Sequence, residues 1–391
     1  MNIIYFGNRD YSDIKTNGHT RFENIFKSLV NLDKYQVVYT RIFNFKNLIN
    51  HASYYLKNFF SIKVVFSDWK IIVRQIKSDK LIILSIYTMS SKNVILRIID
   101  KIEDFMPIKS RAKWIWFNSP FLWDKIKGVD GYKYYFDTVE LYFSVIEYKH
   151  LENSITKTYK KIVKNIHLLT TISESGVAYF KDMNPKLPIH LVKNGIDLNL
   201  FKPIKNRQTN KRQKVVGLIG NLNSNHEYKG LLNAAVELKN IRFVIIGKMH
   251  GGSEFLDENT KDNLSNLFKL PNVEYHEWVP QKELPNFISR FDVGLITYKT
   301  AKNDPGNLLN TGDSLKKYQY LACNIPVISS NCQKLDMPLK KGILVYYNEK
   351  ELKSLIEKVV YSDSNVDYRE LVTNYDWKNI INQIMDYVKN I

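Results

Sequence analysis

Short apolar runs alternate with amphipathic stretches along almost the whole chain of 391 residues, and this alternation limits the available folds more than any other feature. Continuous apolar runs are typical of strands that are buried on both faces of a parallel sheet. Amphipathic stretches between such runs are typical of helices that cover the sheet. The sequence therefore predicts an α/β protein with doubly wound sheets.

The first half of the chain contains one complete set of these elements. Helical patterns occur there at Thr20–Leu32 and Trp69–Lys77. The predicted strands are Ile3–Phe6, Gln36–Thr40, Ile62–Phe66, Leu81–Leu84, Lys113–Phe117, His167–Thr171 and Ile189–Val192. This order indicates a Rossmann-like domain.

The pattern restarts after residues 202–214, a polar and basic segment without apolar periodicity that is typical of a surface connection. Beyond it the predicted strands are Val215–Gly220, Arg242–Gly247, Val273–His276, Val293–Thr297 and Pro326–Ser329. The predicted helices are Tyr228–Lys239, Glu254–Phe268, Lys282–Arg290, Ser314–Ala322, Lys350–Tyr361 and Trp377–Ile391. A second Rossmann-like set is therefore expected.

We expect residues 1–195 to form the first domain, residues 196–375 the second, and residues 376–391 a C-terminal helix that can pack back on the first. Both domains have an ordinary size. Two such domains would face each other across a cleft between the carboxyl ends of their sheets, where ligands of open α/β sheets bind.

Composition excludes several classes of protein. A hydrophobic fraction of 44% is too high for a disordered chain. Two cysteines, Cys323 and Cys332, are too few for a disulfide scaffold and favour a reducing compartment. The N-terminal sequence lacks the pattern of a signal peptide, and the apolar runs are far shorter than the ~20 residues of a membrane helix. We therefore expect a cytoplasmic protein that is soluble or peripheral to the membrane.

The net charge of +18 is unevenly distributed. Residues 1–195 contain 30 basic and 17 acidic residues, which gives +13, and the remainder gives +5. A solvated basic face, an anionic membrane surface, an anionic substrate or a nucleic acid would each account for this excess.

Several common motifs are absent from the sequence. There is no Gly-x4-Gly-Lys-Ser/Thr phosphate loop, no Gly-x-Gly-x-x-Gly fingerprint after a strand and no Asp-x-Asp pair. The eight histidines are scattered without metal-ligand spacing. No metal site is expected.

Four stretches, in this order, carry a resemblance to a known family. They are Val192–Pro203 (VKNGIDLNLFKP), Gly220–Gly230 (GNLNSNHEYKG), Asn272–Tyr298 (NVEYHEWVPQKELPNFISRFDVGLITY) and Ser314–Ser329 (SLKKYQYLACNIPVIS). Together they resemble the C-terminal half of GT-B glycosyltransferases, most of all family 4 and its bacterial cell-surface polysaccharide members. The resemblance implies a UDP-sugar or GDP-sugar donor in the second domain, an acceptor in the first, retention of anomeric configuration, and neither metal nor cofactor.

The resemblance places phosphate contacts in the first stretches of the second domain. Gly217 and Gly220 would let backbone N–H groups approach a pyrophosphate, although a tight turn also explains glycine there. Lys229 falls where the family has a catalytic cation that stabilises the leaving diphosphate. The family's arginine corresponds to about Asn221, which carries no charge. A solvated surface position would also explain Lys229.

Further donor contacts are implied at later strand ends. Gly247 begins a loop that passes the nucleotide in the family, and Trp278 and Val279 lie in the segment that holds the base. Trp278 could stack on the base or simply be a core or edge aromatic.

The segment of residues 311–319 corresponds to the family's Glu-x7-Glu arrangement. Gln319 takes the place of the glutamate that accepts ribose hydroxyls, and it can still accept a hydrogen bond without the charge. Lys316 lies in the first turn of the predicted helix, where its positive charge opposes the helix dipole. A bound phosphate would explain a lysine at this position, and Lys316 is therefore expected to be catalytic. The other expected contacts are Thr311, Gly312, Asp313, Ser314 and Leu315, with Asp313 or Ser314 as the helix N-cap.

Fewer residues stand out in the first domain. Gly18 precedes a helix in the opening loop, which touches the donor phosphate in the family. Asn118 takes roughly the place of a family histidine near the sugar. Asp137 is expected either as a catalytic carboxylate facing the cleft or as part of a helix N-terminal charge cluster.

Residues 45–60 (FKNLINHASYYLKNFF) interleave Lys46 and Lys57 with aromatic residues. A helix with this pattern could bind an anionic membrane surface. It could also be a core helix with a basic outer face.

The function expected from the sequence is transfer of a sugar from a nucleotide diphosphate sugar to a glycan or lipid-linked acceptor, with no nucleic acid as partner. Three alternatives stay open. The chain could be a non-catalytic GT-B partner of another transferase, since Asn221 and Gln319 replace charged residues. It could be a DNA-modifying sugar transferase, given its charge, or a nucleotide-sugar epimerase of the same fold.

Overall fold

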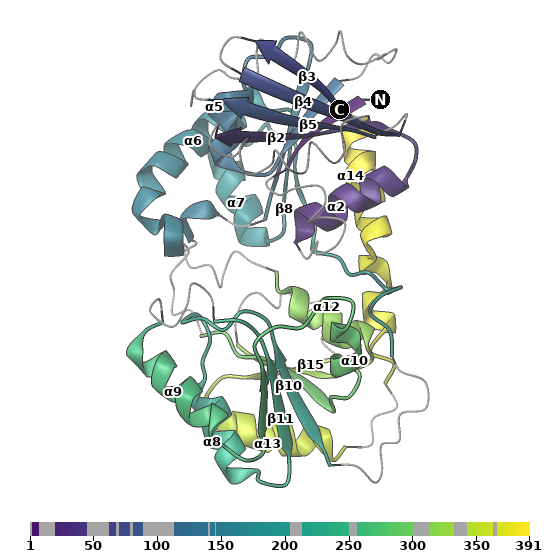
Figure 1. The fold of residues 1–391 in the computed structure, drawn as a ribbon. Coiled ribbons are helices and arrows are strands. Elements are labelled where there is room, and N and C mark those ends of the chain that lie inside the picture. The colour runs from purple at the N-terminus through teal and green to yellow at the C-terminus, as the bar shows by residue number, and fades with distance from the viewer. Residues whose placement is uncertain are drawn as a thin grey trace. The chain divides into compact units, whose positions relative to one another are not determined.

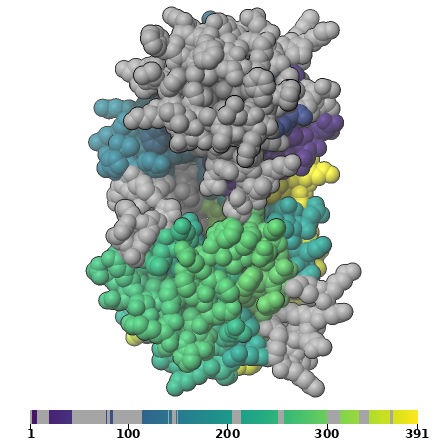
Figure 2. Space-filling model, viewed as in Figure 1, coloured from purple at the N-terminus to yellow at the C-terminus, as the bar shows by residue number. Residues whose placement is uncertain are grey.

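The computed structural model describes two compact units. They are Met1–Val192 together with Ile381–Ile391, here unit 1, and Lys193–Ile380, here unit 2 (Figure 1). The described residues, coloured in Figure 1, are 2–7, 20–44, 62–67, 70–78, 81–88, 113–139, 141–144, 146–203, 213–249, 256–299, 313–331, 342–362 and 366–391, and Figure 2 colours those of them whose side chains are also described.

Unit 1 contains a sheet of nine strands in the order β3-β4-β5-β2-β1-β6-β7-β8-β9. Neighbouring strands are parallel except that β4 runs antiparallel to both β3 and β5. The strands are β1 (Asn2–Phe6), β2 (Gln36–Asn44), β3 (Ile62–Ser67), β4 (Lys70–Ser78), β5 (Leu81–Thr88), β6 (Lys113–Phe117), β7 (Lys133–Thr138), β8 (Leu168–Thr171) and β9 (Ile189–Leu191).

Strand β4 corrects one prediction, because the helix expected at Trp69–Lys77 is this strand. Only two residues separate β4 from each of its neighbours, and such connections join antiparallel strands, whereas a parallel crossover needs a dozen residues or more. The stretch is also rich in β-branched residues, which favour strands. The expectation of a sheet that is parallel throughout therefore fails at this edge. Strand β7 was not predicted from the sequence.

The helices of unit 1 are α2 (Arg21–Asn31), α5 (Trp123–Ile126), α6 (Glu152–Asn165) and α7 (Glu174–Met183), with short 3-10 turns at Pro120–Leu122, Tyr142–Ser144 and Ile146–Leu151. Helix α2 begins in a capping box. The Thr20 hydroxyl accepts from the Glu23 N–H, and the Glu23 carboxylate accepts from the Thr20 N–H. This local signal explains why the predicted and observed helix starts agree within one residue.

Unit 2 contains a six-stranded sheet in the order β12-β11-β10-β13-β14-β15, and every neighbouring pair is parallel. The strands are β10 (Val215–Ile219), β11 (Arg242–Ile246), β12 (Val273–His276), β13 (Val293–Ile296), β14 (Val327–Ser330) and β15 (Ile343–Tyr346), of which the sequence analysis missed β15. The helices are α8 (Lys229–Glu237), α9 (Glu258–Phe268), α10 (Leu284–Ile288), α12 (Leu315–Ala322) and α13 (Glu351–Val360), with a 3-10 turn at Glu370–Tyr375. Helix α14 (Trp377–Lys389) begins in unit 2 and belongs to unit 1 from Ile381 onward.

Two hydrophobic clusters cover the two faces of the unit 2 sheet, and β10 contributes to both. Val215 and Ile219 belong to one cluster, while Val216 and Leu218 belong to the other. This alternation is the physical reason for the continuous apolar run in the sequence, since both faces of the strand are buried. None of the described helices is both long and apolar enough to cross a membrane.

Gly217, in the middle of β10, has a packing role in this arrangement. A Cβ at Gly217 would lie 2.0 Å from ring carbons of Phe291, which is 1% exposed. The ring fills the space that any side chain would need. Packing thus accounts for this glycine.

Gly217→Ala should lower the free energy of unfolding by about 1–3 kcal/mol, because an added methyl group overpacks a filled core. Chemical denaturation monitored by circular dichroism would measure the loss. Phe291→Leu in the same chain should recover part of it by vacating ring space. Equal stability of Gly217→Ala and the unmodified protein would contradict the packing role.

Candidate functional site

The first strand of unit 2 ends at a glycine with a left-handed backbone. Gly220 has a φ of 112°, which side chains with a Cβ rarely adopt. Its N–H donates to the Ile246 carbonyl oxygen at the end of β11 (2.9 Å). A Cβ at the next residue, Gly247, would lie 1.8 Å from the Gly220 carbonyl oxygen. Two strand ends thus meet without side chains at the carboxyl edge of the sheet, where ligands of such sheets bind.

Helix α12 starts with unsatisfied hydrogen-bonding groups. Ser314 is its N-cap residue, yet the hydroxyl makes no capping hydrogen bond. This Oγ is buried without a hydrogen-bond partner. The first N–H groups of a helix also lack partners within the helix and carry its partial positive charge. The start of α12 is therefore suited to an anion. Within α12, Leu315 and Gln319 are half-buried and lie one helical turn apart.

Lys316 brings a positive charge to the same place. Its side chain is 9% exposed, and its Cε lies 2.4 Å from where a Cβ of Gly220 would be. Its Nζ lies 4.8 Å from the centre of the Tyr298 ring, within range of a cation–π interaction. The structure thus brings together two residues that the sequence analysis selected separately, Gly220 and Lys316.

His226 belongs to this group and was missed by the sequence analysis. It is 3% exposed, and its Nε2 lies 3.1 Å from Lys316 Nζ. Its ring stacks on Tyr298 with centroids 4.3 Å apart. Its position within a polar stretch, Asn223–Tyr228, gave no sign of burial. The one available signal was that this stretch makes the spacing to Lys229 longer than in the family.

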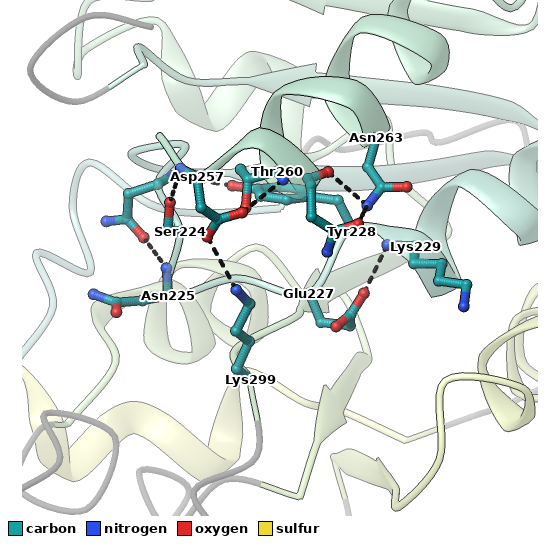
Figure 3. A network of polar contacts seen from close by, with 11 residues as sticks. Ser224, Asn225, Glu227, Tyr228, Lys229, Asp257, Thr260, Asn263 and Lys299 are labelled. Carbon is teal, nitrogen blue, oxygen red and sulfur yellow. Dashed lines mark hydrogen bonds and ion pairs between the residues drawn. The ribbon is translucent and has the colours of Figure 1, made fainter. Parts of the chain in front are cut away.

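Hydrogen bonds outside the site hold the loop that carries His226 (Figure 3). The Lys299 N–H donates to the Asn225 carbonyl oxygen at 2.8 Å, and the Asp257 N–H donates to Ser224 Oγ at 3.0 Å. Lys299 Nζ also lies 3.4 Å from Asp257 Oδ2. Burial alone would raise the pKa of Asp257, but the hydrogen bonds it accepts and the Lys299 ammonium lower it to about 2. The carboxylate therefore stays ionised at physiological pH.

Asp313 is buried and holds two parts of unit 2 together. Its Oδ2 accepts from the Asn194 N–H at 2.8 Å, and its backbone oxygen accepts from Asn194 Nδ2 at 2.7 Å. Lys317 Nζ lies 2.5 Å from Asp313 Oδ1. Asp313 thus acts inside the protein, and Ser314 rather than Asp313 takes the N-cap position.

The other predicted donor contacts differ in their exposure to solvent. Lys229 begins α8, its side chain is 57% exposed, and its Nζ is 3.6 Å from Glu349 Oε1. Asn221 is exposed. Trp278 is 59% exposed, whereas Val279 packs partly buried against the core.

In unit 1 the structure corrects the expectation for Asp137. The side chain is fully buried in β7 and pairs with the equally buried Arg21 of α2, with Nη2 to Oδ1 at 3.1 Å. Thr170 Oγ1 donates to the same carboxylate at 2.6 Å. Asp137 therefore does not face a cleft, and its carboxylate pairs with the first residue of α2 in the interior. The reason is that the buried Arg21 guanidinium requires a counterion.

The Asp137 carboxylate also affects a neighbouring buried tyrosine. Burial, followed by the Asp137 carboxylate, raises the pKa of Tyr135 well above its ordinary value. Tyr135 therefore stays neutral and shares a 2.6 Å hydrogen bond with Thr170.

Asn118, which follows β6, is the second residue of interest in unit 1. It is 1% exposed, and neither its Oδ1 nor its Nδ2 has a hydrogen-bond partner. A buried amide with both atoms unsatisfied is costly unless a ligand or water completes it.

Gly18, Thr311, Gly312 and residues 45–60 lie outside the described residues, so their predicted roles stay predictions. Among the residues that the structure describes, no group of three or more His, Cys, Asp or Glu side chains is placed to hold a metal ion.

Comparison with known proteins identifies the fold. Residues 213–361 match the family model of "Glycosyl transferases group 1". Sucrose-phosphate synthase from Thermosynechococcus elongatus superposes with a TM-score of 0.64 at 13% identity, over 100% of this chain and 98% of that one. Anabaena Alr3699/HepE, solved with UDP and glucose, gives 0.64 at 10% identity over 100% of both chains. The chain therefore has the GT-B fold, with two Rossmann-like α/β units.

One curated relative is similar in sequence over a longer stretch. The chain is 24% identical over 258 residues to "Putative teichuronic acid biosynthesis glycosyltransferase TuaH" of Bacillus subtilis (strain 168). The match covers 60% of this chain and 62% of that relative.

Asp137→Ala should lower the free energy of unfolding by about 3–5 kcal/mol, because it leaves the Arg21 charge buried without a counterion. Urea unfolding would measure the loss. The matched control is Asp124→Ala, whose carboxylate pairs with Lys127 at the surface and should contribute at most about 1 kcal/mol. The double change Arg21→Met, Asp137→Leu should be much milder than Asp137→Ala. Similar losses for Asp124→Ala and Asp137→Ala would refute a buried ion pair.

Proposed function

We propose that this protein is a glycosyltransferase that moves a sugar from a nucleotide diphosphate sugar, a UDP-sugar or GDP-sugar, to a polysaccharide or lipid-linked acceptor. The observation that carries the proposal is the position of the Lys316 side chain beside Gly220, in the first turn of a helix whose N-cap hydroxyl has no partner. The match of residues 213–361 to glycosyl transferases group 1 supports it. So does the name of the TuaH relative, which refers to teichuronic acid biosynthesis.

The chemistry of the transfer matches these groups. As the bond between the sugar's anomeric carbon and the diphosphate oxygen breaks, negative charge grows on the leaving diphosphate. The Lys316 ammonium, the first N–H groups of α12 and the Ser314 hydroxyl would stabilise that charge. The half-buried Gln319 would accept a hydrogen bond from a ribose hydroxyl.

We further propose that unit 2 binds the donor and unit 1 the acceptor. Because groups of the protein itself supply the positive charge at the diphosphate, transfer would be independent of metal ions and of a resident cofactor. Retention of anomeric configuration is part of the same proposal. In unit 1, the unsatisfied amide of Asn118 is suited to hydrogen bonds with sugar hydroxyls.

A binding role without catalysis is the second candidate. It is favoured by the exposed, uncharged Asn221 and by Gln319, which stand where the resembled family has charged residues. Slow hydrolysis of a donor sugar, detected as released nucleotide, would support catalysis. Nucleotide binding with no release from any donor would support the partner role.

Lys316→Met should weaken nucleoside diphosphate binding by roughly tenfold or more, since a charge-assisted hydrogen bond contributes ~1.5–3 kcal/mol. Binding of the matching nucleoside should change little. A thermal-shift panel of UDP, GDP, ADP and CDP would first identify the base, because ligands of the native state raise the melting temperature. Calorimetry would then measure the affinities.

Lys229→Ala is the comparison, because this exposed lysine already pairs with Glu349 and should matter less. Methionine at position 316 keeps the apolar stem against Gly220, so packing is preserved. Unchanged diphosphate affinity in Lys316→Met would refute the proposed donor site.

We also propose that the protein acts at the cytoplasmic face of an anionic membrane, because the basic excess lies in residues 1–195. The double change Lys46→Glu, Lys57→Glu should strongly reduce co-sedimentation with anionic liposomes, and rising salt should do the same to the unmodified protein. Nucleotide binding should be unaffected. Unchanged co-sedimentation of the double variant would move membrane contact away from residues 45–60.

A further inference from the structure

A buried histidine lies in the candidate donor site, and it contacts the lysine on which the site depends. His226 Nε2 lies 3.1 Å from Lys316 Nζ, and His226 Nδ1 lies 3.3 Å from Thr297 Oγ1. The imidazole stacks on Tyr298 with an angle of 26° between the rings. Both ring nitrogens and one ring face therefore have defined neighbours from two other segments of unit 2.

The hydrogen-bonding capacity of the two side chains defines the state of the imidazole. A lysine ammonium has three donors and no acceptor, so His226 Nε2 must offer its lone pair to Lys316. The single proton of the neutral ring then lies on Nδ1, which donates to Thr297 Oγ1. A second proton, on Nε2, would turn the acceptor into a donor and place two positive charges about 3 Å apart, a repulsive arrangement.

Two tyrosine side chains also lie beside the ring. Tyr298 follows β13 and packs face to face, and Tyr228, before α8, has its ring centre 5.9 Å away. Burial raises the pKa of Tyr228 far above its ordinary value, so it stays neutral. The adjacent Glu227 carboxylate accepts from the Lys229 N–H at 2.8 Å.

We propose that His226 is a positioning residue. Its neutral imidazole holds the Lys316 ammonium beside Gly220 for the donor diphosphate, and protonation of the ring releases that ammonium and weakens donor binding. The proposal rests on the proposed donor site. It adds a residue to that site and a pH dependence that Lys316 alone would not produce, because lysine keeps its charge over the range in which imidazoles titrate.

Two substitutions distinguish the contribution of the hydrogen-bond acceptor of His226 from that of its aromatic ring. His226→Gln keeps an oxygen near the position of Nε2 that can accept from Lys316, and it cannot gain a proton. His226→Phe keeps the stacking on Tyr298 and removes the acceptor. His190→Gln makes the same change in unit 1, where His190 stacks on Tyr387, and serves as the control.

The test is calorimetric titration with the nucleoside diphosphate selected by thermal shift, between about pH 5.5 and 8, a range that brackets imidazole titration. The unmodified protein and His190→Gln should lose roughly tenfold more affinity towards acid pH than His226→Gln. Because the ligand's own phosphate titrates equally in all samples, the difference between variants isolates His226. His226→Phe should bind weakly at every pH, with nucleoside binding preserved.

The outcomes separate the two proposals. The role of His226 is refuted if the unmodified protein binds with the same pH profile as His226→Gln, or with the same affinity as His226→Phe. Either result would still agree with the proposed donor site. No binding of any nucleoside diphosphate at any pH overturns both. An imidazole nitrogen spectrum that shows the proton on Nε2 at neutral pH would also overturn the inference.

Discussion

The candidate site lies at the start of helix α12, and the buried carboxylate of Asp313 anchors the residue just before its N-cap. Asp313 accepts hydrogen bonds from the Asn194 N–H and the Tyr318 hydroxyl, and it pairs with Lys317. Both side chains of this ion pair are 1% exposed, so each charge needs the other. Two consecutive lysines consequently have different environments. Lys317 neutralises the interior carboxylate, while Lys316 extends towards Gly220 and His226.

Much of this architecture could be predicted, because parallel strands buried on both faces leave a strong signal. The strands at Lys113–Phe117 and Val273–His276 were predicted with the bounds that the structure gives. Gly220 and Lys316 were also recognisable, Gly220 as a glycine at a strand end that lets a ligand approach the backbone, and Lys316 as a cation in a first helical turn, where its charge contradicts the helix dipole. Such contradictions between propensity and position are typical of functional sites.

What could not be predicted depends on contacts between distant parts of the chain. His226 and Thr297 meet only because the segments that carry them pair side by side, and nothing near either residue indicates the partner. Asp137 lies 116 positions from Arg21, so its burial as an ion pair was not visible in the sequence. The strand at Lys70–Ser78 was misread because its apolar residues also fit a helical period, and only the two-residue connections on both sides decide for a hairpin.

The chain passes between the two units twice, after Val192 and after Ile380, and this order has a consequence for synthesis. Unit 2 is one continuous segment, whereas unit 1 combines the first part of the chain with Ile381–Ile391. That last segment contributes buried side chains such as Ile384 and Met385, and the Ile391 oxygen accepts from Lys133 Nζ at 2.8 Å. On a ribosome, where domains ordinarily fold in the order of their synthesis, unit 2 can fold as soon as it emerges. The unit that is started first is completed last.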